Sequence, residues 1–207
     1  MTGQEHQLRA DLRIIADLVP EGSKVLDIGC GDGELLAWLS RHKNVDGRGM
    51  ELSQAGVNAS IARGLSVVQG DADTDLNHYP AHIYDYAILS QTLQTMRDPK
   101  AVLANLVRIG RQAIVSVPNF GYWKSRLYLL FRGRMPVTKT LTHQWYDTPN
   151  IHFCTLSDFV ELCEVMHITL GKRVYVDDRG ITSSFQGKGA FANLFGEQGV
   201  FMLSSGK

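Results

Sequence analysis

Residues 25–33 constrain the fold of this chain more than any other segment. Residues 25–28 have the apolar composition of a short buried strand, and glycines follow at positions 29, 31 and 33. Glycine tolerates a positive φ angle and, having no Cβ atom, lets the backbone approach a ligand closely. A strand, a glycine turn and then a helical pattern predict an α/β fold that binds a nucleotide-type ligand at the turn.

The spacing of this turn disfavours a dinucleotide. The dinucleotide fingerprint G-x-G-x-x-G needs its third glycine, or an alanine, at position 34, where this chain has Glu34. A carboxylate would then stand where the helix that faces the pyrophosphate requires a small residue. NAD is therefore not the expected ligand.

Acidic residues stand at or near the ends of three successive apolar segments. Asp27 precedes the glycines, Glu51 ends the next segment, and Asp71 comes directly after the third. The carboxyl ends of parallel strands meet at one edge of a sheet, which is where open α/β folds bind ligands. Three acids at this edge favour an adenosine with a positively charged tail.

Strand and helix patterns alternate along the chain, which predicts a parallel sheet with helices on both faces. A length of 207 residues with 44% hydrophobic content suits one domain, residues 1–207. The first pattern is a covering helix over residues 8–19. The later helices are expected at 33–41, 53–63, 99–109 and 156–166. The strands are expected at 24–28, 47–51, 65–69, 84–89, 112–117, 169–176 and 199–204.

Two segments interrupt the alternation. Residues 119–152 form an insertion rich in aromatic and basic side chains, with a single carboxylate at Asp147. This insertion is interpreted as a lid over a small molecule, a docking surface for another protein, or a solvated amphipathic helix. Residues 177–198 contain several glycines and are expected to form a loop between the last two strands.

Composition excludes several classes of function. The formal net charge is zero, so no global field favours nucleic acid or an anionic membrane. The three cysteines and seven histidines show no metal-binding spacing, and no metal is expected. No apolar run reaches the roughly 20 residues of a membrane span. Because the start of the chain also lacks the pattern of a signal peptide, a reducing cytoplasm is the expected location.

The motifs together resemble a known family. Residues 27–33, Glu51 and residues 70–73 are similar to the cofactor site of class I S-adenosylmethionine (SAM)-dependent methyltransferases. Within that superfamily, the chain resembles the MetW family of methionine biosynthesis proteins. The segments that carry this second resemblance are residues 9–12, 22–33, 89–94, 118–123 and 150–155.

The resemblance implies a fold, a cofactor and a partner. The fold would be Rossmann-like, with a seven-stranded, mostly parallel sheet and an antiparallel final strand. SAM or S-adenosylhomocysteine would bind with the glycine loop at its methionine part, Glu51 at the ribose, and Asp71 with Ala72 at the adenine. The implied partner is a homoserine O-acyltransferase. The cofactor-binding candidates are Asp27, Gly29, Cys30, Gly31, Glu51, Leu52, Asp71, Ala72, Ser90 and Gln91.

Catalytic residues are harder to assign. Cys30 has no recognisable histidine base near it, so a small residue between two glycines is preferred over a nucleophile. His152 is the weak catalytic candidate, with a packing or capping role as its alternative. Residues 90–92 are polar but neutral, and the motifs of nucleic-acid methyltransferases are absent.

Two functions therefore stay open. The first is a cofactor-binding interaction protein that supports the acyltransferase. The second is a methyltransferase that acts on an unidentified small molecule under the 119–152 insertion, because methyl transfer can proceed largely through positioning.

Overall fold

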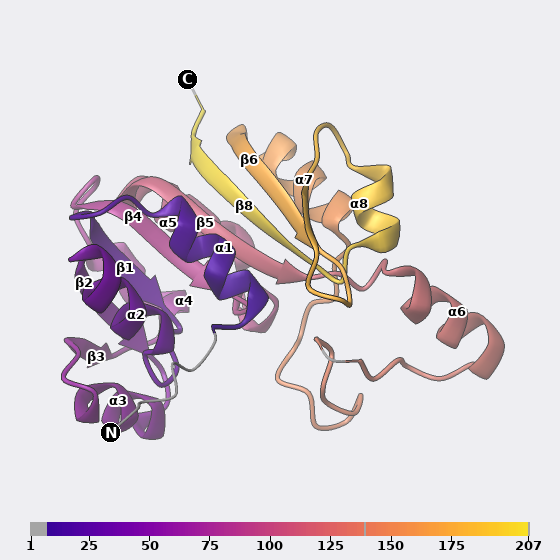
Figure 1. The fold of residues 1–207 in the computed structure, drawn as a ribbon, viewed down its shortest axis with the longest axis horizontal. Helices are drawn as coiled ribbons and strands as arrows, with labels where there is room; N and C mark the ends of the chain where they lie inside the picture. Colours follow the sequence, from indigo (N-terminus) through magenta and orange to yellow (C-terminus); the bar gives the residue numbers. More distant parts are fainter. Residues whose placement is uncertain (1–7, 139, 207) are drawn as a thin grey trace.

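The computed structural model describes residues 8–138 and 140–206 and is built on one mixed β-sheet (Figure 1). Its strand order is β3-β2-β1-β4-β5-β8-β6-β7. Strands β1 to β5 pair in parallel, whereas β8, β6 and β7 join by antiparallel pairing. The strands are β1 (Lys24–Ile28), β2 (Asp46–Glu51), β3 (Val67–Gln69), β4 (Tyr84–Ser90), β5 (Gly110–Pro118), β6 (Ile168–Val176), β7 (Thr182–Ser184) and β8 (Gln198–Ser205).

Helices cover both faces of this sheet. Apolar side chains of α1 and α2 pack on one face, and those of α5 and α7 pack on the other. Two short 3-10 turns, η1 (Leu76–His78) and η2 (Leu93–Thr95), flank β4. The helices are α1 (Ala10–Leu18), α2 (Glu34–Lys43), α3 (Gln54–Ala62), α4 (Ala72–Asp75), α5 (Pro99–Ile109), α6 (Trp123–Arg132), α7 (Leu156–Val165) and α8 (Ala190–Phe195).

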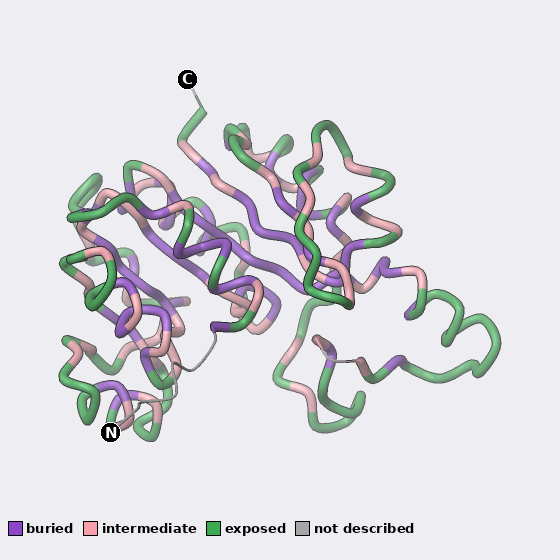
Figure 2. Tube along the Cα trace, in the orientation of Figure 1, coloured by how far each residue is buried: buried purple, intermediate pink, exposed green. Residues whose placement is uncertain are grey.

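The central strands are buried on both sides (Figure 2). In β1, Val25 joins the core under α1 and α2, whereas Leu26 and Ile28 join the core under α5 and α7. This division follows from the two-residue repeat of a strand, which sends successive side chains to opposite faces. Strands covered on both faces need continuous apolar runs, which is why these segments stand out in the sequence.

The predicted Rossmann-like α/β fold is confirmed, with one strand more than the expected seven. The additional strand, β7, pairs with β6 at the edge of the sheet. It lies in the segment expected to be a loop, which also contains α8. The sequence did not predict β7 because its three residues, Thr-Ser-Ser, are too short and too polar to show an apolar repeat.

The insertion leaves the body of the molecule after β5. Figure 1 shows α6 projecting away from the sheet, followed by an irregular segment that returns toward α7. Figure 2 shows that most of this excursion is exposed. Within the described residues, no helix is long and apolar enough to cross a membrane.

The packing of α7 on the sheet gives a stability prediction. Phe159 is buried, and its ring centroid lies 4.5 Å from that of Phe201 on β8. We expect Phe159→Ala to lower the free energy of unfolding by about 3–5 kcal/mol, because the truncation leaves a cavity. Urea denaturation measures this change. The control Phe191→Ala removes an exposed ring and should change stability by less than about 0.5 kcal/mol. Equal midpoints for the two variants would contradict the packing of α7 on β8.

Candidate functional site

The carboxyl ends of the parallel strands frame two adjoining cavities. The glycine-turn cavity, about 260 Å³, is lined in part by Asp27, Gly29, Cys30, Gly31, Ser90 and Gln91. The acidic-edge cavity, about 240 Å³, is lined in part by Gly29, Glu51, Leu52, Asp71, Ala72 and Gln91. All ten predicted cofactor-binding residues therefore line one or both cavities.

The glycine turn is fixed by its backbone conformation and by the neighbouring strand. Gly29, Gly31 and Gly33 have φ angles of 69°, 57° and 77°. The amides of Gly29 and Cys30 both donate to the Met50 carbonyl, at 2.8 and 3.2 Å. A Cβ atom at Gly29 would lie 2.8 Å from the Thr92 side chain. A Cβ at Gly31 would meet no atom within 4 Å, because Gly31 faces open space in the cavity.

Glu51 ties the end of β2 to this turn. Its Oε2 accepts from the Gly31 amide and its Oε1 accepts from the Ser53 amide, both at 2.9 Å. A carboxylate has about four acceptor positions, so each oxygen keeps capacity for a ligand hydroxyl. Glu51 is thus oriented by two hydrogen bonds from the backbone.

Asp27 is the electrostatically unusual group of the site. Its side chain is buried at the end of β1. Burial, and secondarily the charge of Glu51, raise its pKa from 3.8 to about 7, although Arg9 acts in the opposite direction. A positively charged ligand beside Asp27 would relieve both unfavourable effects. The burial of Asp27 at the wall of the glycine-turn cavity, with Glu51 nearby, therefore favours a cationic group there.

Asp71 begins the helix beyond β3. Its Oδ1 accepts from the Asp73 amide at 3.0 Å, which caps α4, and its own amide donates to Asp75 at 2.9 Å. This capping fixes the carboxylate at the wall of the acidic-edge cavity. The carboxylate of Asp73 instead accepts from the backbone amides of Arg97 and Asp98, so it holds a loop in place.

The end of β4 connects the two cavities with a third. Gln91 has a φ of 52°, unusual for a residue other than glycine, and lines all three cavities. Its amide donates to the carbonyl and hydroxyl oxygens of Ser116, each at 3.0 Å, and its side chain donates to Gln198 at 3.0 Å. The hydroxyl of Ser90 donates to Asp11 at 3.2 Å. These hydrogen bonds hold the strained backbone in place.

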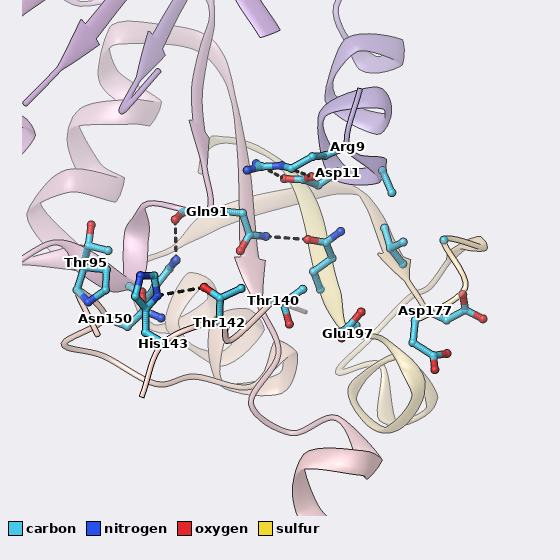
Figure 3. Close-up of a pocket in the computed structure, with 17 residues that line it drawn as sticks. Arg9, Asp11, Gln91, Thr95, Thr140, Thr142, His143, Asn150, Asp177 and Glu197 are labelled. Carbon is cyan, nitrogen blue, oxygen red and sulfur yellow. Dashed lines mark hydrogen bonds and ion pairs between the residues drawn. The ribbon is translucent and has the colours of Figure 1, made fainter. Parts of the chain in front are cut away.

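The third and largest cavity, about 560 Å³, is formed by segments far apart in the sequence (Figure 3). Arg9 and Asp11 form a two-point ion pair at its edge, with contacts of 3.2 and 3.1 Å. His143 and Asn150 come from the insertion, and Figure 3 shows them across the cavity from Asp177. We call this space the large cavity.

Comparison with known proteins identifies the family. Residues 9–203 match the family model described as Methionine biosynthesis protein MetW. The chain belongs to the MetW family. A relative from Rhodopirellula baltica, named Bifunctional methionine biosynthesis protein MetXA/MetW, is 35% identical over 187 residues. That match covers 84% of this chain but only 29% of the relative, so the chain spans less than a third of that protein's length.

Solved structures show that this chain shares its fold with SAM-dependent methyltransferases. A possible histamine N-methyltransferase from Thermotoga maritima matches with a TM-score of 0.68 and 18% identity, covering 94% of this chain and 87% of that one. A TehB-like methyltransferase from Corynebacterium glutamicum matches with a TM-score of 0.61 and 18% identity, covering 97% and 90%. At these identities the likeness shows the fold alone.

The two residues considered for catalysis have different surroundings. Burial raises the pKa of Cys30 to about 12, with Asp27 adding to the effect, so the thiol stays neutral rather than nucleophilic. His152 is exposed, and its amide donates to the Gln94 carbonyl at 3.0 Å. His152 is absent from the lining of the three cavities, and its catalytic role stays a prediction.

Among the described residues, no group of three or more His, Cys, Asp or Glu side chains is placed to hold a metal ion.

Sequence reasoning missed most of the large cavity. Arg9, Gln94, His143 and Gln198 line it, yet none of them is among the predicted site residues. Arg9 and Gln94 do lie within segments that carried the MetW resemblance, and this was the available signal. His143 and Gln198 gave none, because His143 lies in the irregular part of the insertion and Gln198 begins β8 without a recognisable motif.

Asp27 predicts a pH-dependent stability. The folded protein keeps a proton on Asp27 up to about pH 7, whereas the unfolded chain releases it near its ordinary pKa of 3.8. The free energy of unfolding should therefore fall as pH rises from about 4 to about 7. Asp27→Asn removes this dependence, so relative to wild type the variant should gain stability between pH 5 and pH 8. The gain is at most a few kcal/mol, at about 1.4 kcal/mol per pKa unit.

Urea denaturation at the two pH values measures the effect. The matched control is Asp17→Asn, because Asp17 is exposed on α1 and its side chain remains in contact with water. If Asp27→Asn and wild type differ by the same amount at both pH values, the buried carboxyl does not titrate as described.

Proposed function

We propose that this MetW protein binds SAM or S-adenosylhomocysteine in the cytoplasm and associates with a homoserine O-acyltransferase, whose activity it supports in methionine biosynthesis. The observation that carries the proposal is the bifunctional MetXA/MetW relative, in which a MetW-like part is joined to a second methionine biosynthesis protein. Fusion places two activities of one process on a single chain, which suggests that the separate proteins also work together.

The residues of the site fit the proposed cofactor. The open space beside Gly31 admits a ligand close to the backbone, and the buried Asp27 carboxyl favours a cation. SAM carries a sulfonium and an ammonium group, so it places positive charge near Asp27, which a neutral nucleoside does not. Glu51 and Asp71 supply fixed acceptors for ribose hydroxyls and an adenine amine in the adjoining cavity.

A second candidate function is methyl transfer to a small molecule. When bound, SAM supplies a methyl group to a nucleophile placed in line with the sulfonium. The large cavity favours this candidate because it adjoins both cofactor cavities through Gln91 and has room for an acceptor. Gln91, Thr92 and Thr95, where the cavities join, are neutral and would orient an acceptor without removing its proton.

A pair of glycine variants tests the cofactor site. Gly31 and Gly22 both have positive φ angles, 57° and 71°, and a Cβ at either would meet no atom within 4 Å. Gly22 precedes β1 at the opposite end of the strand. Gly31→Val and Gly22→Val should each lose about 1–2 kcal/mol of stability through backbone strain.

Only Gly31→Val should also lose SAM affinity, by at least about tenfold in Kd, because its side chain occupies the cavity. Calorimetric titration with SAM and with S-adenosylhomocysteine measures the affinities, and thermal melts confirm folding. Wild-type affinity in folded Gly31→Val would show that the cofactor binds elsewhere.

The two candidate functions predict different results with purified proteins. If this protein supports the acyltransferase, the two proteins should co-elute in size-exclusion chromatography, and adding it should raise the rate of homoserine acylation. No S-adenosylhomocysteine should form when this protein, SAM and a metabolite extract are incubated without the acyltransferase. Turnover of SAM in that incubation would favour the second candidate, and failure to co-elute or to change the acylation rate would contradict the first.

A further inference from the structure

Helix α6 exposes an apolar stripe that lies outside the three cavities. Trp123, Leu127, Leu130 and Phe131 recur at the spacing that places side chains on one face of a helix. Such a stripe ordinarily packs against a partner element, but here Leu130 and Phe131 are 73% and 77% exposed. The apolar surface continues after the helix through Met135 and Val137, both of which are exposed. We call residues 123–137 the arm.

The root of the arm is held in place. Tyr122, just before the helix, is buried, and so is Ser125 in its first turn. Lys124 forms an ion pair with Asp178 in the turn between β6 and β7. The side chain of Arg126 donates to the Gly121 carbonyl at 2.5 Å. The exposed stripe is therefore carried on a defined helix rather than on a loose loop (Figure 1).

The charge of the arm has one sign. Residues 123–137 contain four basic side chains and no carboxylate, these being Lys124, Arg126, Arg132 and Arg134. Arg132 and Arg134 are exposed at the end of the helix, next to Phe131. An apolar stripe beside arginines fits an apolar groove with carboxylates along its rim, since aromatic and arginine side chains concentrate binding energy at interfaces.

We propose that the arm is the surface through which this protein docks onto homoserine O-acyltransferase, by laying the α6 stripe into an apolar groove with an acidic rim. The proposal rests on the proposed function, because it names the contact surface for that partner. The bifunctional relative supports this occupant, since its name joins a MetXA part and a MetW part on one chain. An amphipathic helix in a groove is an established mode of recognition.

The docking surface lies apart from the proposed cofactor site. The arm follows β5, whereas the glycine turn, Glu51 and Asp71 follow β1, β2 and β3. None of Leu130, Phe131, Arg132 and Arg134 lines the three cavities. Substitutions at these exposed positions are therefore expected to leave SAM binding unchanged.

Two full-length variants test the proposal against a matched control. Phe131→Asp places a charge on the stripe, and the control Phe191→Asp does the same to a phenylalanine on α8 that is 76% exposed. The double variant Arg132→Glu/Arg134→Glu reverses the charge at the end of the arm. Affinity for purified homoserine O-acyltransferase is measured by surface plasmon resonance at 50 and 300 mM salt. SAM affinity is measured in parallel as a check on folding.

We expect Phe131→Asp to weaken binding at least about tenfold, with Phe191→Asp within about twofold of wild type. The double arginine variant should bind more slowly and lose most of the salt dependence. If wild type does not bind the acyltransferase, the proposed function itself fails. If wild type binds and Phe131→Asp binds equally well, the arm is not the docking surface and the proposal fails alone.

Two further measurements test whether the stripe binds a different partner. Light scattering of wild type and Phe131→Asp shows whether the stripe joins two copies of this chain. Sedimentation with vesicles of phosphatidylcholine and phosphatidylserine shows whether it binds an anionic membrane. A dimer, or vesicle binding, that Phe131→Asp abolishes while acyltransferase affinity stays at the wild-type value would overturn the proposal.

Discussion

The site depends on the parallel pairing of β1 with its two neighbours. Asp27 lies opposite Gly49 of β2 and Ile88 of β4, so all three strands end at the same edge. This register brings the glycine turn beneath the Met50 carbonyl, which accepts two amides of the turn. It also places Glu51 where its carboxylate accepts from the Gly31 amide. A slip of one residue would send Asp27 to the opposite face of the sheet and separate these groups.

The same pairing brings carboxyl groups together at some cost to stability. Asp27 is taken out of water beside Glu51, and its raised pKa records both unfavourable effects. Arg9 offsets part of this cost, but its guanidinium is already shared with the buried Asp11. A buried carboxyl close to a second carboxylate is stabilised in its charged form by a cationic ligand. Ligand binding and folding stability are therefore linked through Asp27.

Local motifs were predictable from the sequence, whereas features assembled from distant segments were not. Helix α5 was predicted with its exact bounds because Asp98 and Pro99 mark its start and an apolar repeat follows. All ten cofactor candidates line the predicted edge because strand ends converge in any parallel sheet. The large cavity requires the insertion to fold back against β4 and the last strands, which no local pattern encodes. The strand β7 forms through pairing with β6 rather than through its own three polar residues.

The insertion and the strand ends impose separate demands on the chain. Strand-end residues must satisfy a register shared by several strands, so a change at Asp27 or Gly31 acts on packing, backbone strain and charge together. The exposed positions of α6 satisfy no such register, because Leu130 and Phe131 contact solvent rather than core. Their apolar character therefore has no explanation in the folding of this chain. An exposed apolar stripe on a firmly held helix lowers the solubility of the protein. Binding of the stripe to another molecule would remove this cost.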